Sequence, residues 1–220
     1  MTDIIQTMIH LLKNPLEVLT NWIEHFGPWI YLLLFLIVFC ETGLVFMPLL
    51  PGDSLLFAAG ALAGTTGKLE VAVLIPLLIL AALAGDNVNY HVGKTLGPRV
   101  FRWPKSKLFN PEHLVRTREF YERHGRKAVI LARFAPILRT CAPFVAGVGD
   151  MRYRVFALFS VIGAVLWVGI FVGAGAYFGQ QEVVRKNFTH VILAIVVISL
   201  LPAMFSFARA HWQSRRSPGK

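Results

Sequence analysis

Charged residues are scarce in this chain. Only 15% of its 220 residues are Asp, Glu, Lys or Arg, whereas 55% are hydrophobic. So little polar surface argues against an ordinary soluble domain, because too few residues could cover so much apolar area. Cysteine is also rare: Cys40 and Cys141 both lie in apolar segments without metal-ligand spacing. The seven histidines form no recognisable ligand set, so neither a disulfide nor a metal nor another cofactor is expected.

The features of a secretory signal and of a known hydrolase are missing as well. The first 27 residues lack a basic start and a small-residue cleavage site, and they fit an interfacial amphipathic helix better. Gly52-Asp53-Ser54-Leu55 alone resembles the nucleophile block of a serine esterase family, but such enzymes also need a late Asp-x-x-His pair, and none occurs in the sequence. We therefore expect no enzymatic activity and interpret Ser54 as a cap on the next short helix.

Long uncharged runs dominate what is present. Residues 155–181 and 191–208 contain no charged side chain, and each run is long enough to cross a hydrocarbon core of about 30 Å as a helix. A third span, 71–93, becomes polar in its last turns, and between residues 28 and 52 the only charge is Glu41. These runs predict a multi-pass membrane protein.

Basic residues predict the orientation. The segment 94–127 holds ten Lys or Arg against three Glu, and the tail 209–220 holds four Lys or Arg with no acid, so both should be cytoplasmic. Membrane topology explains this charge without a nucleic-acid partner. An even number of crossings must separate the two segments, which 155–181 and 191–208 supply, with an outside loop at 182–186. The side on which the N-terminus lies stays open.

The intervening segment 128–150 must then enter and leave on the cytoplasmic side. Its prolines, Pro136 and Pro143, argue against one straight spanning helix and favour a re-entrant hairpin shielded by protein. Residues 110–127 resemble a surface helix that starts at Asn-Pro and stops at Gly125.

The two halves of the chain resemble each other. Aligning Pro48 with Pro136 matches "PLLPGDSLLFAAGA" with "PILRTCAPFVAGVG", and each stretch precedes a long apolar span that ends with Tyr and Gly. The predicted fold is an all-α integral membrane domain, an inverted repeat of a re-entrant helical hairpin plus a transmembrane helix, with amphipathic surface helices. Its parts are the first repeat half at 28–93, the basic cytoplasmic loop and helix at 94–127, the second half at 128–181, a C-terminal transmembrane helix at 188–208 and the tail at 209–220.

Charged side chains inside the broken segments mark a candidate site. An Asp, Lys or Arg at a helix centre in lipid costs at least about 2.5–3.5 kcal/mol, so such residues should face protein or water. We predict proton coupling at Glu41, Asp53 and Asp86, and phosphate binding at Arg133 and Arg139, since a guanidinium offers a fork of donors that suits phosphate. The alternative is that these charges pair with each other only to hold the two hairpins together. Helix breaks that would turn backbone amides toward a headgroup are predicted at Pro48, Pro51, Gly52, Pro136 and Pro143.

Four stretches resemble the DedA family of bacterial inner-membrane proteins, a group also known for a SNARE-associated or VTT-type domain. They are "FCETGLVFMPLLPGDSLLFAAGALA" (39–63), "GDNVNYHVGKTLG" (85–97), "FYERHGRKAVILARFAPILRTCAPFVAGVGDM" (120–151) and "GAVLWVGIFVGAGAYFG" (163–179). The resemblance implies two oppositely oriented re-entrant hairpins and proton-motive-force-dependent transport for envelope maintenance. It also implies that the family's essential acidic pair falls on Glu41 and Asp53 and its essential arginines on Arg133 and Arg139.

Two functions follow as hypotheses. The first is a flippase that moves a lipid phosphate, undecaprenyl phosphate or a phospholipid, across the inner membrane; its partners are then that lipid and protons, and a homo-oligomer stays open. The alternative is a small-ion/proton antiporter that uses the same carboxylates, although the arginines would repel a cation.

Overall fold

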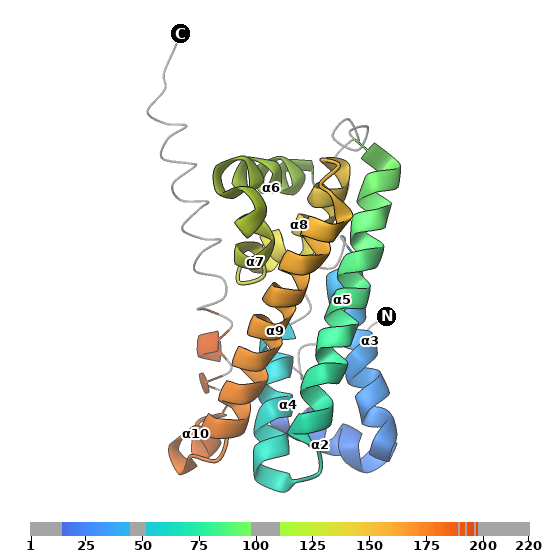
Figure 1. Ribbon diagram of the computed structural model, residues 1–220. Coiled ribbons are helices and arrows are strands. Elements are labelled where there is room, and N and C mark those ends of the chain that lie inside the picture. The colour runs from blue at the N-terminus through green and yellow to red at the C-terminus, as the bar shows by residue number, and fades with distance from the viewer. Residues whose placement is uncertain are drawn as a thin grey trace, which may run out of the picture.

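A computed structural model describes residues 15–44, 52–97 and 111–197, except 189, 192 and 196, and every regular element in these ranges is a helix. The helices are α2 (Pro15–Phe26), η1 (Gly27–Trp29), α3 (Ile30–Gly43), α4 (Gly52–Thr66), α5 (Val71–Leu96), α6 (Pro111–His124), η3 (Gly125–Lys127), α7 (Ala128–Ala132), α8 (Pro136–Val148), α9 (Tyr153–Phe178) and α10 (Glu182–Lys186). Figure 1 shows α5 and α9 running the full height of the bundle.

Within the described residues, three segments are long and apolar enough to cross a membrane: Thr20–Gly43, Val71–Leu96 and Tyr153–Phe178. The second and third are 26 residues each; at 1.5 Å per residue they are about 39 Å long, more than a hydrocarbon core of about 30 Å. The first is bent at Gly27, whose φ of 51° lies in the left-handed region. The chain is thus a multi-pass membrane protein, and the predicted spans 71–93 and 155–181 are confirmed as long helices.

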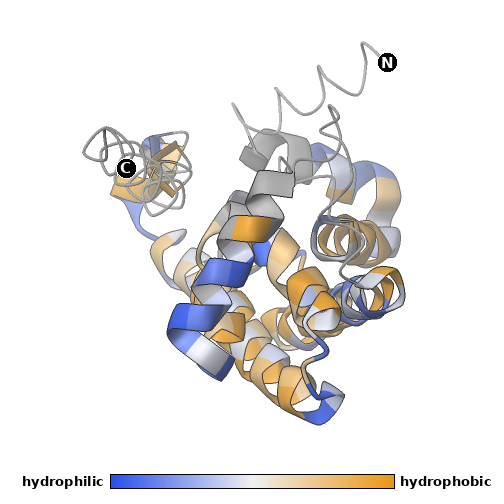
Figure 2. Cartoon of the chain, turned by 90° about the horizontal axis from the view of Figure 1, so that it is seen from above, coloured by the Kyte–Doolittle hydropathy of each residue, from blue (hydrophilic) through white to orange (hydrophobic). Residues whose placement is uncertain are grey.

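The outward faces of the long helices carry apolar side chains. Leu158, Val165 and Ile170 on α9 are exposed, as are Leu80 on α5 and Leu36 on α3. Seen from above, hydrophobic residues predominate along the bundle helices (Figure 2). A surface of this kind suits contact with lipid rather than water.

The shorter apolar helices lie toward opposite ends of the bundle. In Figure 1, α4 lies in the lower half, next to α9, whereas α7 and α8 lie in the upper half beneath α6. With 15 and 13 residues, α4 and α8 are about 22 and 20 Å long and are too short to cross the core. Each packs against a long helix that is distant in the sequence, α4 against α9 and α8 against α5.

Glycines allow the backbones of α4 and α9 to approach closely. A Cβ on Gly60 would lie closer than 3.0 Å to the carbonyl of Val172, and one on Gly175 would meet the carbonyl of Phe57 in the same way. Each helix therefore presents a small residue to the backbone of the other, as is common where helices pack in membranes.

The crossing of α8 and α5 repeats this arrangement. A Cβ on Gly147 would overlap the carbonyl of Tyr90, and one on Gly93 would overlap that of Phe144. Phe57 and Gly60 on α4 thus correspond to Phe144 and Gly147 on α8, which shifts the alignment of Pro48 with Pro136 by one residue. The tyrosines near the ends of the two long helices differ in their surroundings, because Tyr90 is buried and Tyr177 is 67% exposed.

Other local predictions have mixed outcomes. The surface helix is confirmed as α6, which ends before Gly125 at φ 57°. The loop expected at 182–186 is instead the short helix α10. Pro136 begins α8 as predicted, but Pro143 does not break the helix. Proline lacks one backbone N–H of the helix, and packing of α8 against α5 offsets the missing hydrogen bond.

Several predictions fall on other parts of the chain. Pro48 and Pro51, residues 98–110 of the basic loop, residues 198–208 of the C-terminal span and the tail 209–220 lie outside the described residues.

Candidate functional site

Arg139 of α8 lies between two buried carboxylates from α3 and α4. Its Nη1 is 2.5 Å from Oδ1 of Asp53, at the start of α4, and its Nη2 pairs with Oε1 of Glu41, near the end of α3. All three residues are at most 8% exposed. One guanidinium therefore connects α8 to both α3 and α4.

Two neighbouring groups hold these carboxylates in place. The backbone N–H of Gly52 donates to Oε1 of Glu41 at 3.2 Å, and a Cβ on Gly52 would overlap that carboxylate. The indole Nε1 of Trp167 donates to Oδ1 of Asp53 at 2.8 Å, while the Arg139 guanidinium carbon lies 4.7 Å from the centroid of the indole ring. We call Glu41, Asp53, Arg139 and Trp167 the central cluster.

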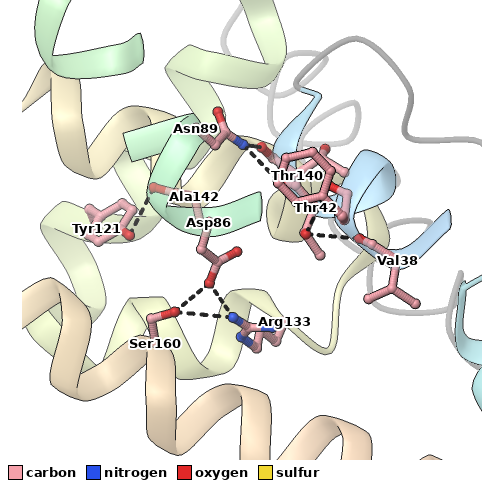
Figure 3. Close-up of polar contacts among 10 residues, drawn as sticks. Val38, Thr42, Asp86, Asn89, Tyr121, Arg133, Thr140, Ala142 and Ser160 are labelled. Atoms are coloured by element: carbon pink, nitrogen blue, oxygen red, sulfur yellow. Dashed lines mark hydrogen bonds and ion pairs between the residues drawn. The ribbon is translucent and has the colours of Figure 1, made fainter. Parts of the chain in front are cut away.

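A second buried cluster contains Asp86, Arg133 and Ser160 (Figure 3). Arg133 lies in the turn between α7 and α8, and its Nη2 pairs with Oδ2 of Asp86 and donates to Oγ of Ser160 at 3.2 Å. The Ser160 hydroxyl in turn donates to Oδ2 of Asp86. We call these three residues the Asp86 cluster; they connect α5, the turn between α7 and α8, and α9.

Asn89 of α5 links α3 to α8. Its Nδ2 donates to the carbonyl of Thr42 at 3.1 Å and to the carbonyl of Thr140 at 2.8 Å (Figure 3). Both acceptors are backbone groups close to the charged residues, so α5 holds α3 and α8 together at the level of the site.

The two clusters together contain three carboxylates and two guanidinium groups, so one proton would balance their charge. Several of their polar atoms are buried and have no hydrogen-bond partner among the described residues: Oε2 of Glu41, Nε and Nη1 of Arg133, and Nε of Arg139. Because an unpaired buried polar group costs free energy, these atoms favour a further ligand, water or an anion for the guanidinium donors and a proton for the carboxylate.

The structure brings all five predicted charged residues together and gives their pairing, which the sequence left open. Asp53 pairs with Arg139, whereas Arg133 pairs with Asp86. Asp86 is only 3% exposed and so lies inside the bundle.

Ser54 does not cap α4. It lies inside the first turn of the helix, which begins at Gly52, and its buried hydroxyl has no partner in the described part of the chain. Gly52 begins α4. Its backbone N–H donates to the carboxylate of Glu41, and its lack of a side chain leaves room for that carboxylate.

Sequence reasoning missed Trp167, Ser160 and Asn89. Periodicity is the signal that could have identified Ser160 and Trp167, because they are seven residues apart in a mostly apolar helix and so lie on one face. In the ranges described, no group of three or more His, Cys, Asp or Glu side chains is placed to hold a metal ion.

Comparison with known proteins places the chain in a family. A family model described as the VTT domain matches residues 50–177. Protein DedA of Escherichia coli strain K12 is 48% identical over 208 residues, 94% of this chain and 95% of that protein. An uncharacterized membrane protein of Mycobacterium tuberculosis strain H37Rv is 43% identical over 184 residues, 83% of this chain and 81% of that protein. Inner membrane protein YqjA of Escherichia coli strain K12 is 32% identical over 182 residues, 81% of each chain.

No solved structure matches the chain. The VTT-domain match covers more than half of the sequence, and the likeness to Protein DedA extends over nearly the whole of both proteins. The buried charges lie at positions within or next to the matched domain. The chain therefore belongs to the DedA family of VTT-domain membrane proteins.

Proposed function

We propose that this protein is a proton-linked transporter that moves a lipid phosphate across the bacterial inner membrane, with undecaprenyl phosphate as the first candidate and a phospholipid as the second. The observation that carries the proposal is the position of Arg139. It is buried in a membrane bundle, bonded to carboxylates of the opposite hairpin, and its Nε has no partner among the described residues.

The proposed architecture is an inverted repeat of two re-entrant hairpins, each followed by a long transmembrane helix. Its support is reciprocal packing, because α4 lies against α9 and α8 lies against α5. The Phe-x-x-Gly contacts at Gly60 and Gly147 add to this support, since they recur in the same form at both crossings. In inverted-repeat transporters the substrate site lies where the two repeats meet near the bilayer midplane.

In the proposed mechanism, phosphate and carboxylates compete for the same guanidinium donors. A phosphate that binds Arg139 replaces Asp53 and Glu41, and the freed carboxylates take up protons because an unpaired buried charge is costly. Release of the lipid restores the ion pairs and returns the protons. The lipid chain stays in the hydrocarbon region while its headgroup crosses between the hairpins.

The two clusters lie at different depths. Ser160 and Trp167 are seven residues apart on α9, which places the Asp86 cluster about 10 Å nearer the α6 end of the bundle. We propose that the α6 end faces the cytoplasm, since α6 and η3 carry basic residues, and that the C-terminus is cytoplasmic as well. The Asp86 cluster is then the charged site nearer the cytoplasm, and Asp86 takes part in proton transfer at that site.

We further propose that the protein is not a hydrolase. Ser54 is buried, and its hydroxyl makes no hydrogen bond to a base among the described residues. A serine nucleophile needs such a base. Labelling of Ser54 by a fluorophosphonate probe would contradict this assignment.

Reconstitution tests the transport proposal. Purified protein in sealed proteoliposomes should accelerate movement of labelled undecaprenyl phosphate, and an imposed pH gradient should change the rate. Asp53→Asn and Glu41→Gln should abolish the response to the gradient, whereas Lys68→Ala, which alters only an exposed ion pair with Glu24, should retain it. If vesicles without protein move the lipid equally fast, the proposal fails; ion flux without added lipid would favour an antiporter.

A further inference from the structure

One face of α9 contacts both arginines. Ser160, Gly163 and Trp167 are all buried, and their spacing of three and then four residues places them on the same side of the helix. This face points toward the second hairpin and the start of α4, and the sequence predictions assigned it no role. The described contacts give each of its three residues a distinct relation to Arg133 or Arg139.

Ser160 and Gly163 position Arg133. The Ser160 hydroxyl accepts from Nη2 of Arg133 at 3.2 Å and donates to Asp86, so it fixes the end of the guanidinium. Gly163 leaves room for the stem: a Cβ there would lie 2.9 Å from Cδ and 3.0 Å from Nε of Arg133. Any larger residue at 163 would therefore displace the Arg133 side chain.

Trp167 contacts both guanidinium groups. The centroid of its ring lies 4.7 Å from Cζ of Arg139 and 6.0 Å from Cζ of Arg133, and its N–H donates to Asp53. Cations at these distances over an indole face are attracted by its quadrupole, and the attraction is stronger where water is excluded. The ring is thus a shared surface between the central cluster and the Asp86 cluster.

We propose that Ser160, Gly163 and Trp167 form a positioning track that orients Arg133 and Arg139 for binding of the phosphate headgroup, an inference that rests on the proposed function. The arginines belong to a turn and to the first turns of a short helix, whereas α9 is a continuous helix of 26 residues. A rigid element therefore sets the geometry of two long and flexible side chains. The track touches the arginines and not the reacting lipid, so its residues are positioning residues.

The first test compares two glycines on α9. Gly163→Ala should raise the apparent KM for undecaprenyl phosphate in proteoliposomes about tenfold, equivalent to about 1.4 kcal/mol of binding, while the maximal rate changes little. Gly169→Ala is the matched control, because a Cβ at Gly169 meets no atom within 4 Å. For Trp167, the Phe variant keeps a ring and loses the N–H, and the Leu variant loses both, so KM should rise from wild type to Phe to Leu.

A second test does not depend on transport. Gly163→Ala should lower the melting temperature of the detergent-solubilised protein. In an Arg133→Ala background, where the overlapping Cδ and Nε are gone, the same change should have only the small effect of Gly169→Ala. Gly169→Ala should have the same small effect in both backgrounds. The positioning proposal would be overturned if Gly163→Ala changed the melting temperature equally in both backgrounds. It would also be overturned if the KM of Gly163→Ala equalled that of Gly169→Ala.

The two tests separate the inference from the function on which it rests. If the wild type moves no lipid phosphate but the background dependence at Gly163 is seen, the proposed function fails and the track stands as a positioning device. If the wild type is active and the effects in the two backgrounds are equal, the track is wrong and the transport proposal stands.

Discussion

Replacing Arg139 by Ala should destabilise the protein more than any exposed charge change. The substitution leaves Glu41 and Asp53 buried and close together without their shared cation. Breaking a buried ion pair from one side costs about 3–5 kcal/mol. For a chain of this size, about 2–4 °C per kcal/mol converts that loss into a melting temperature lowered by about 6–20 °C.

The effect can be separated from simple loss of packing. Adding Glu41→Gln and Asp53→Asn to Arg139→Ala removes the uncompensated charge, so the triple variant should melt at a higher temperature than Arg139→Ala alone. Thermal unfolding in detergent, followed by circular dichroism, measures both. Lys68→Ala is the control, because exposed ion pairs contribute only about 0–1 kcal/mol. A triple variant no more stable than Arg139→Ala would refute the charge argument.

Three further predictions follow from the structure. Gly52→Ala should abolish lipid transport without loss of helix content, because a Cβ there overlaps the carboxylate of Glu41; wild-type rates in proteoliposomes would contradict this. Gly147→Val should force α8 away from the α5 backbone and cost about 1–3 kcal/mol in thermal unfolding, and an unchanged melting temperature would argue against the close crossing. In a background without the native cysteines, Lys68→Cys should react with an impermeant maleimide from outside intact cells, whereas Arg126→Cys should react only after permeabilisation; labelling of both from one side would exclude the proposed orientation.

The long helices were predictable because a membrane leaves few alternatives. A predominantly apolar run of about 20 residues satisfies its backbone in lipid as a helix, so the spans 71–93 and 155–181 follow directly from the sequence. The surface helix α6 was predictable from its Asn-Pro start and from Gly125, where the left-handed backbone ends it. Local signals of this kind do not depend on tertiary contacts.

The candidate site was predictable in membership but not in pairing. A charge inside an apolar segment is costly, so Glu41, Asp53 and Asp86 were recognisable one by one. The pairing of arginines with acids depends on the depth and rotation of each helix in the bundle. No local sequence pattern predicts that depth or rotation. The structure pairs Arg139 with two acids and leaves Arg133 to Asp86.

Trp167 was missed for a related reason. A tryptophan within an apolar run is also typical of a lipid-facing or interfacial side chain. Its role depends on the face of α9 that it occupies, and that face is defined by partners distant in sequence: Asp53 is 114 residues away. For Pro143 the local rule that proline breaks a helix gave the wrong prediction, because α8 continues through this residue while packed against other helices.

The most direct test of the central claim compares Arg139→Lys with the wild type in undecaprenyl phosphate transport. Lysine keeps the positive charge but lacks the fork of donors that bonds Asp53 and Glu41 together and that would bind phosphate. Proteoliposomes of equal protein content should show transport by the wild type and a loss of about tenfold or more in Arg139→Lys, as expected when about 1.4 kcal/mol of bidentate binding is removed. Transport by Arg139→Lys at the wild-type rate would contradict a role for the Arg139 guanidinium in binding the headgroup.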